Sequence, residues 1–225
     1  MTNQIFLSDF IDLSKVEDNK LFTSDNVTAY LGEGLKTWLA QFLDSLGVGA
    51  EPLIKGQVHA GSFVSGKVYI AAGAVVEPTA YIDGPTYIGP GAQVRHGAYV
   101  RGQCYIGPRA VVGHTTEVKG SVFLDDAKAG HFAYVGDSFL GRDVNLGAGT
   151  KLANLPFKRS SIRVVDPRGQ GVIDTGLRKF SALMGDTSQT GCNAVLSPGT
   201  LLLPGTAVFP TAHYRGTLKE GVFRG

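Results

Sequence analysis

Aliphatic residues recur at every sixth position through the middle of this chain. The unbroken series is Val58, Val64, Ile70, Val76, Ile82, Ile88, Val94, Val100, Ile106, Val112, Val118 and Leu124. A period of six fits neither an amphipathic helix nor a simple alternating strand. It is typical of a hexapeptide-repeat β-helix, a mainly β solenoid in which each short strand points one aliphatic side chain inward.

Composition narrows the class of protein. The 225 residues are 43% hydrophobic and 18% charged, as in a globular protein, and the 31 glycines fall mostly between hexads, where turns are needed. A formal net charge of +2 gives no reason to expect a nucleic-acid partner. The chain shows no basic leader and no apolar run of about 18 residues, so we expect no membrane contact and a cytoplasmic location.

The six-residue period divides the chain into an amino-terminal part without repeats and a repetitive part. Residues 1–50 lack it, and apolar residues at helical spacing predict a helix from about Val27 to Leu46, with Trp38 on its apolar side. We expect this part to be a helical cap over the open end of the coil, because a terminal strand would otherwise expose unpaired backbone groups. Residues 51–225 form the predicted β-helix domain, from which a basic loop at about 155–180 extends.

The period also predicts which residues stack. Three hexads make one turn, so residues 18 apart lie on adjacent coils roughly 4.8 Å apart. Arg101 and Lys119 have this spacing, and Asp83 lies one coil before Arg101. The two cations could form an anion site, or Arg101 could pair with Asp83 on a solvated surface. After Leu124 the intervals shorten, and we expect His131 to lie where the period slips.

Several motifs in the later coils resemble a known family. They are T-E-V-K at 116–119, G-H-x-x-Y-x-G-D at 130–137, N-x-G-A-G-T at 145–150 and D-T-G-L-R-K at 174–179. This pattern resembles the acetyltransferase domain of the bifunctional glucosamine-1-phosphate acetyltransferase / N-acetylglucosamine-1-phosphate uridylyltransferase. It also resembles the carboxyl-terminal domain of archaeal-type sugar-1-phosphate nucleotidylyltransferases. The resemblance covers about residues 81–210.

The resemblance implies a left-handed parallel β-helix that forms a homotrimer with active sites between subunits. It implies acetyl-CoA as co-substrate, no metal, and His131 as the general base that receives the proton of a sugar amine. Asn154 would orient the amine or the acetyl group, and the N–H of Ala148 would donate to the thioester oxygen. The residues implied to bind the sugar phosphate are Arg101, Lys119, Tyr134 and Asn145.

The loop departs from the family pattern. Lys158, Arg159 or Arg163 would replace the lysines that the family carries there, so we predict Lys158 and Arg163 as substrate-binding residues. Cys192 stands at a position near the family's cofactor site, and with Arg178 and Lys179 it completes the predicted cofactor-binding set. Some 50 residues before the coils are too few for a nucleotidylyltransferase domain, so such an enzyme would be a separate partner.

These features predict an acetyl-CoA-dependent N-acetyltransferase of glucosamine- or galactosamine-1-phosphate. A second hypothesis is a non-catalytic protein that binds a sugar phosphate and regulates a separate nucleotidylyltransferase. A γ-type carbonic anhydrase shares the hexapeptide coil, but its closely paired histidines are missing from this sequence. Transfer of a longer acyl chain also stays open, because the coil does not choose the acyl group.

Overall fold

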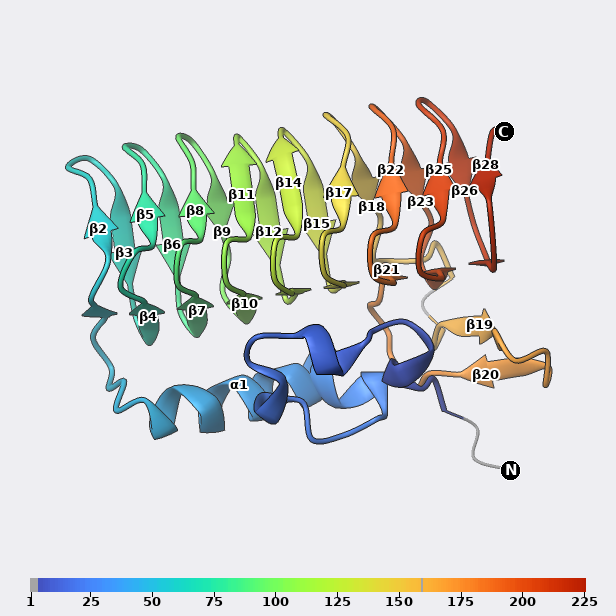
Figure 1. Ribbon diagram of the computed structural model, residues 1–225, viewed down its shortest axis with the longest axis horizontal. Coiled ribbons are helices and arrows are strands. Elements are labelled where there is room, and N and C mark those ends of the chain that lie inside the picture. The colour runs from blue at the N-terminus through green and yellow to red at the C-terminus, as the bar shows by residue number, and fades with distance from the viewer. Residues whose placement is uncertain (1–3, 159) are drawn as a thin grey trace.

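The computed structural model describes residues 4–158 and 160–225, and their architecture is a parallel β-helix (Figure 1). Its strands form three long parallel sheets, which we call faces 1, 2 and 3 in the order in which the chain visits them. The predicted mainly β, hexapeptide-repeat solenoid is therefore confirmed. No helix in the described part of the chain has the length and apolar content that a membrane crossing requires.

Each face is a stack of strands from successive coils. Face 1 contains β1 (Leu53–Ile54), β4 (Val68–Ile70), β7 (Thr86–Ile88), β10 (Cys104–Ile106), β13 (Val122–Phe123), β16 (Phe139–Leu140), β21 (Ala182–Met184), β24 (Thr200–Leu202) and β27 (Thr217–Leu218). Face 2 contains β2 (Gln57–Val58), β5 (Val75–Val76), β8 (Gln93–Val94), β11 (Val111–His114), β14 (Lys128–His131), β17 (Asn145–Leu146), β22 (Gln189–Thr190), β25 (Ala207–Val208) and β28 (Val222–Phe223). Face 3 contains β3 (Phe63–Ser65), β6 (Tyr81–Asp83), β9 (Tyr99–Val100), β12 (Glu117–Lys119), β15 (Tyr134–Gly136), β18 (Lys151–Leu152), β23 (Val195–Leu196) and β26 (His213–Tyr214).

The aliphatic series fills the interior of the prism, as predicted. From Ile70 to Val118 its members are fully buried in one core cluster, while Val58 and Val64 at the first coil are partly buried. The prediction for the end of the series was wrong, because Phe123 and not Leu124 enters this core. Ile106 pairs with Phe123, 17 residues further on, so the step from Val118 to the next inward residue is five.

Between Val118 and Met184 the irregular steps all fall at the corner that joins face 3 to face 1, which we call the 3–1 corner. The step from Val118 to Phe123 is five residues, and so is the step from Val135 to Leu140 one coil later. In the following coil the chain leaves the same corner after Asn154 and returns at Phe180, whose N–H donates to the Asn154 carbonyl at 3.1 Å. Two deletions and one insertion are thus stacked at a single corner.

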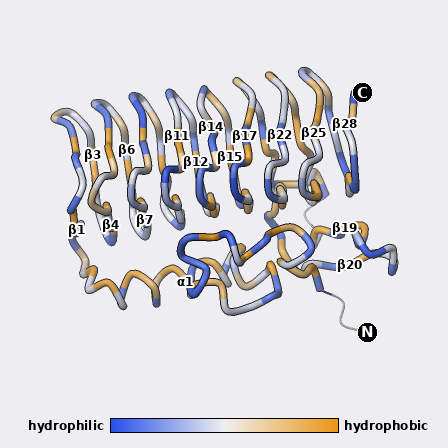
Figure 2. The backbone as a smooth tube through the Cα atoms, viewed as in Figure 1, coloured by the Kyte–Doolittle hydropathy of each residue, from blue (hydrophilic) through white to orange (hydrophobic). Residues whose placement is uncertain are grey.

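The amino-terminal segment lies along the outer surface of face 1 and does not cover the end of the coil (Figure 1). It contains the 3-10 turns Leu7–Asp9, Leu13–Lys15, Asn19–Leu21 and Val27–Tyr30, followed by the helix α1 (Gly32–Ser45). Apolar residues recur along this segment (Figure 2). Among them, Leu35, Leu39 and Leu43 of α1 are buried against outward side chains of face 1. The predicted role of a cap over the open end was wrong.

Aromatic side chains explain this placement. Face 1 carries outward tyrosines in successive coils, and Tyr87 and Tyr105 stack with their ring centroids 5.0 Å apart. Such a surface would be costly to leave in water. Trp38 packs 5.4 Å from Tyr105 and donates its indole N–H to the Leu21 carbonyl at 3.0 Å. The helix predicted from Val27 begins as a 3-10 turn, for which the side chain of Asn26 provides the amino-terminal cap.

The insertion is a folded element. It contains the antiparallel hairpin β19 (Arg163–Val165) and β20 (Val172–Asp174), whose buried Val164 and Ile173 join the core of the amino-terminal segment. At the hairpin turn, Arg168 pairs with Asp9 at 2.9 Å and lies over the ring of Phe6 at 3.8 Å. The segment along face 1 therefore holds the insertion in place.

Candidate functional site

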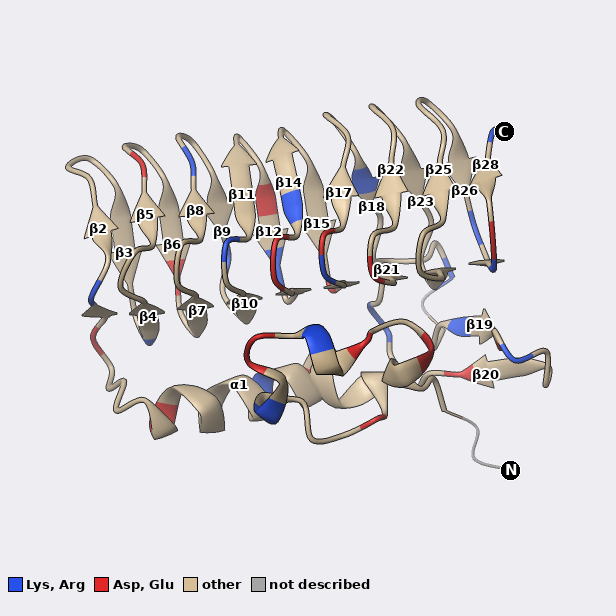
Figure 3. Ribbon diagram, viewed as in Figure 1, with Lys and Arg blue, Asp and Glu red and all other residues tan. Residues whose placement is uncertain are grey.

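Charged residues of both signs lie on the middle coils, from β9 to β18, as they also do on the first and last coils (Figure 3). Arg101 and Lys119 lie on neighbouring coils of face 3, as the period predicts, since the Arg101 N–H donates to the Val118 carbonyl at 2.9 Å. Arg101 forms its ion pair with Glu117, at 2.7 Å, and Asp83 instead accepts a hydrogen bond from Ser65. The alternative pair of Arg101 with Asp83 is thus not formed.

A buried carboxylate lies at the second short corner. Asp137 follows β15, and its side chain is only 7% exposed. Lys119 Nζ lies 3.2 Å and 3.4 Å from the two carboxylate oxygens, and Asn154 Nδ2 donates to Oδ2. The shortened steps bring Lys119, Asp137 and Asn154, from three successive coils, into one hydrogen-bonded chain. Lys119 and Asn154 are predicted site residues, whereas Asp137 is not among them.

Tyr134 lies beside this chain of polar groups, and its hydroxyl approaches Asn154 where Gly136 has no side chain. A Cβ placed on Gly136 would lie 2.6 Å from Tyr134 Oη and 2.8 Å from Asn154 Nδ2, so the absence of a side chain allows both groups to approach. Burial, followed by the negative charges of Asp137 and Glu117, raises the pKa of the Tyr134 hydroxyl. The phenol therefore stays protonated near neutral pH and can donate a hydrogen bond.

His131 occupies a different corner, where face 2 joins face 3. It is exposed at the end of β14 and pairs in register with His114. The steps at this 2–3 corner keep six residues, from Ala129 to Val135, so the prediction that His131 lies where the period slips was wrong. His96 and His114, one coil apart, stack with centroids at 5.2 Å and an interplanar angle of 4°.

Ala148 and Cys192 continue the column of His131 along the 2–3 corner. The Gly149 N–H donates to the His131 carbonyl at 3.1 Å, and the Asn193 N–H donates to the Ala148 carbonyl at 2.8 Å. The N–H of Ala148 itself has no hydrogen-bond acceptor among residues 4–158 and 160–225. An imidazole and an uncommitted backbone donor thus occupy adjacent coils, roughly 4.8 Å apart in strand spacing.

The remaining predicted residues are distributed over other surfaces. Asn145 is exposed on face 2, paired in register with Lys128 and Gln189, and so lies on a different face from Tyr134. Arg178 and Lys179 are exposed immediately before Phe180, at the 3–1 corner. The predicted cofactor-binding set is therefore divided between the two edges of face 3. Arg159 lies outside the described residues.

A cavity of about 740 Å³ lies between the insertion and the last coils of face 3. Lys158, Arg163 and Arg215 line it, no carboxylate does, and none of these three cations forms an ion pair with a described residue. Ser197 Oγ and His213 Nε2, which also line it, are 2.7 Å apart. Arg215 is not among the residues predicted from the sequence, although an 18-residue step from Ser197 places it on the same outward row.

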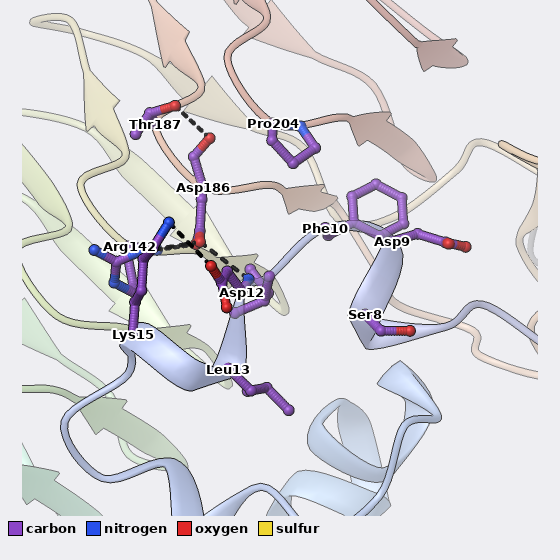
Figure 4. Close-up of a pocket in the computed structure, with 11 residues that line it drawn as sticks. Ser8, Asp9, Phe10, Asp12, Leu13, Lys15, Arg142, Asp186, Thr187 and Pro204 are labelled. Carbon is purple, nitrogen blue, oxygen red and sulfur yellow. Dashed lines mark hydrogen bonds and ion pairs between the residues drawn. The ribbon is translucent and has the colours of Figure 1, made fainter.

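A second cavity, of about 630 Å³, lies where the amino-terminal segment meets the coil (Figure 4). Its central carboxylate, Asp186, pairs with Arg142 at 3.2 Å and accepts the backbone N–H groups of Arg142 and Asp12 at 2.8 Å and 3.1 Å. None of the predicted site residues lines this cavity. These contacts anchor the segment and leave the carboxylate satisfied.

Comparison with known proteins gives one family match. The profile of the family described as the GMPPB C-terminal domain matches residues 82–208. That range contains the polar chain on face 3, His131 and the insertion, but it ends before His213 and Arg215.

Curated relatives match the same part of the chain. A protein of Sulfurisphaera tokodaii named bifunctional sugar-1-phosphate nucleotidylyltransferase/acetyltransferase is 36% identical over 103 residues, which is 46% of this chain and 25% of the relative. A protein of Methanococcus maripaludis strain S2 named bifunctional protein GlmU is 38% identical over 146 residues, 65% of this chain and 35% of the relative. The matches thus span about a quarter to a third of these two relatives.

Proposed function

Because the chain belongs to the family of the GMPPB C-terminal domain, we propose that it is an acetyl-CoA-dependent N-acetyltransferase of a hexosamine-1-phosphate. One similar protein is named a nucleotidylyltransferase/acetyltransferase, and another is named bifunctional protein GlmU. The similarity of this chain to the matched regions of both supports the proposal. The observation that carries the proposal is the placement of His131 and the Ala148 N–H on adjacent coils of one corner. Acyl transfer to an amine needs these two functions, a base and an oxyanion donor.

In the proposed reaction the sugar amine attacks the carbonyl carbon of the acetyl thioester. A neutral His131 imidazole takes the proton that the amine nitrogen loses as the new C–N bond forms. The Ala148 N–H donates to the thioester oxygen as negative charge develops on it. The C–S bond then breaks, and the CoA thiolate leaves and becomes protonated. Since Asn154 lies at the opposite edge of face 3 from His131, the proposed reaction uses Asn154 of one subunit, held by Asp137, to orient the amine toward His131 of a neighbouring subunit.

Positive charge in the cavity beside face 3 favours a phosphorylated sugar over a neutral one. Arg101 and Lys119 are each offset by a carboxylate, Glu117 and Asp137, so this pair of cations binds an anion more weakly than two bare charges would. Of the cavity cations, Lys158 and Arg215 form no ion pair with a described residue, and Arg163 faces Asp174 across the hairpin without an ion pair. We therefore assign the phosphate groups of the two substrates to the surface that runs from Lys119 to this cavity.

A homotrimer would unite residues that one chain keeps apart. Tyr134 and Asn154 belong to face 3 and its far corner, while Asn145 belongs to face 2. Face 3 also exposes a ladder of aromatic rings in the first coils: Phe63 and Tyr81 stack at 4.6 Å, and Tyr99 follows at 5.4 Å. Exposed apolar patches of this kind mark contact surfaces. Light scattering on the purified protein measures the number of copies directly.

Thiol release tests the activity. Purified protein should release CoA thiol from acetyl-CoA when glucosamine-1-phosphate or galactosamine-1-phosphate is added, and should not do so with the corresponding N-acetylated sugar phosphate, which has no free amine. If no hexosamine phosphate supports thiol release, while calorimetry shows sugar-phosphate binding without acetyl-CoA binding, the non-catalytic hypothesis replaces this one.

A further inference from the structure

Asp137 is the least exposed charged residue of the polar chain on face 3. Its carboxylate contacts Lys119 Nζ through both oxygens, at 3.2 Å and 3.4 Å, and accepts from the side-chain amide of Asn154 through Oδ2. One acidic group therefore touches a cation assigned to the phosphate and an amide assigned to the amine. Removing this carboxylate would change both the charge around Lys119 and the hydrogen bonding of the Asn154 amide.

The backbone fixes Asp137 before any ligand binds. Its N–H donates to the Lys119 carbonyl at 2.8 Å, and its carbonyl accepts the Ser181 N–H at 3.0 Å. Its φ of 45° lies in the left-handed region, which aspartate tolerates better than most residues. One coil earlier stands Gly120, with φ of 56°, where a Cβ would lie 2.7 Å from Asp137 Oδ1. A side chain at position 120 would therefore displace this carboxylate.

We propose that Asp137 is a positioning residue for acyl transfer, which sets the orientation of the Asn154 amide and offsets the charge of Lys119. This inference rests on the proposed function. An ionised carboxylate can only accept hydrogen bonds, so it must face the NH₂ group of Asn154 and not its oxygen. Asn154 Oδ1 is then directed away from Asp137, where it can accept a hydrogen bond from the sugar amine and align the nitrogen lone pair with the thioester.

Asp137→Asn separates the two roles. The new amide offers both a donor and an acceptor, so Asn154 can bind it in either orientation, and the productive fraction falls. At the same time Lys119 loses its counter-charge and attracts a phosphate more strongly. The variant should therefore bind the sugar phosphate more tightly yet turn it over more slowly. A residue with a merely structural role would not produce opposite changes in the two quantities.

Asp186 provides the matched control. Its side chain is 11% exposed, it pairs with an arginine at 3.2 Å and it accepts backbone N–H groups, but it lies beneath the amino-terminal segment. Asp186→Asn should lower the thermal midpoint by an amount comparable to Asp137→Asn. It should leave both kcat and the KM for sugar phosphate of the folded protein unchanged.

The test is steady-state thiol release with the sugar phosphate varied at saturating acetyl-CoA. For Asp137→Asn we expect kcat to fall roughly 30-fold and KM for the sugar phosphate to fall about threefold. The double variant Lys119→Met/Asp137→Asn should lose the gain in KM, because the gain comes from Lys119. Unchanged kcat, a raised KM, or the same pattern in Asp186→Asn would overturn the assignment.

Calorimetry and a second variant test the role of Asp137 even if the protein releases no thiol or the first variant does not fold. If the wild-type protein releases no thiol, the proposed function fails. Calorimetry with glucosamine-1-phosphate still tests the offset of Lys119, since Asp137→Asn should bind about threefold more tightly and equal affinity would contradict it. If the asparagine variant does not fold, Asp137→Ser has a smaller side chain and also lacks the charge, so the same opposite changes are expected of it.

Discussion

The regular coils and the coils after Val118 differ at one corner of the prism. From Ile70 to Val118 every step is six residues, and each 3–1 corner repeats the one below it. In the next three coils that corner is shortened twice and then opened by the insertion. The 2–3 corner, which carries His131, keeps its six-residue step throughout these coils.

This difference shows how a repeat protein builds a local site without losing its core. The inward residues of the irregular coils, such as Phe123, Val135 and Leu140, are as buried as those of the regular ones. A deletion at a corner changes only the outward residues, and it places Asp137 between Lys119 and Asn154. The regular 2–3 corner thus aligns His131 and Ala148 on adjacent coils. The irregular 3–1 corner brings Lys119, Asp137 and Asn154 into contact.

The largest expected effect is at the regular corner. His131→Ala should lower kcat about 10³-fold, because general-base catalysis contributes roughly 10²–10⁴-fold. The matched control is His114→Ala, one coil earlier on the same corner, which should keep kcat within about twofold. Thiol release at saturating substrates measures both. Equal losses in the two variants would show that the column of histidines, and not His131 itself, is required.

Restoring the six-residue step after Val118 should remove the first of the two shortened steps at the 3–1 corner. One glycine inserted after Gly120 should move Lys119 relative to Asp137 and lower kcat/KM by roughly 10²-fold, since a misplacement of about 1 Å can cost that much. The coil should keep its β-rich circular dichroism, because the core residues are unchanged.

A glycine inserted after Gly169, in the exposed hairpin turn, serves as the control for this insertion. It should leave kcat/KM near the wild-type value. A fully active protein after insertion at Gly120 would show that the shortened corner has no part in the site.

Arg215 tests whether the cavity beside the insertion belongs to the site. Arg215→Gln should raise KM for one phosphorylated substrate about tenfold with little change in kcat, because a charge-assisted hydrogen bond to a phosphate is lost. Comparing acetyl-CoA with its form lacking the 3′-phosphate, and both with the sugar phosphate, identifies the substrate. Arg224, which lies over Phe209 at the last coil, is the control position. Unchanged KM values for all three would exclude Arg215.

The smallest effect concerns stability outside the site. Asp125 accepts the Glu17 N–H at 2.7 Å, and burial raises the pKa of its carboxyl group despite that bond and the nearby Arg109. The unfolded chain thus releases this proton at a lower pH than the folded one does. The stability from this group is complete below the unfolded pKa and is lost as pH rises through the folded pKa.

Asp125→Asn should remove that contribution. The difference between the free energies of unfolding at pH 3.5 and pH 7, measured with urea, should shift in favour of pH 7 relative to the wild type. The variant should keep its kcat, because Asp125 lies under the amino-terminal segment. An unchanged difference would show that Asp125 titrates alike in both states.

The sequence predicted the solenoid because aliphatic residues at every sixth position specify the inward column. It predicted the stacking of Arg101 on Lys119 for the same reason. It misplaced Leu124 and the slip near His131, since a missing residue in a hexad can be accommodated at any of three corners and only strand pairing shows which. The position of α1 also depended on a surface, the outward tyrosines of face 1, whose exposure only the fold determines.

A crystal structure with glucosamine-1-phosphate and CoA tests the central claim most directly. We expect the sugar amine nitrogen within hydrogen-bond distance of Asn154 Oδ1, and the CoA sulfur along the column of His131 and Ala148. Sugar bound instead at the aromatic ladder of the first coils, or away from the 3–1 corner altogether, would contradict the claim that the irregular corner forms the site.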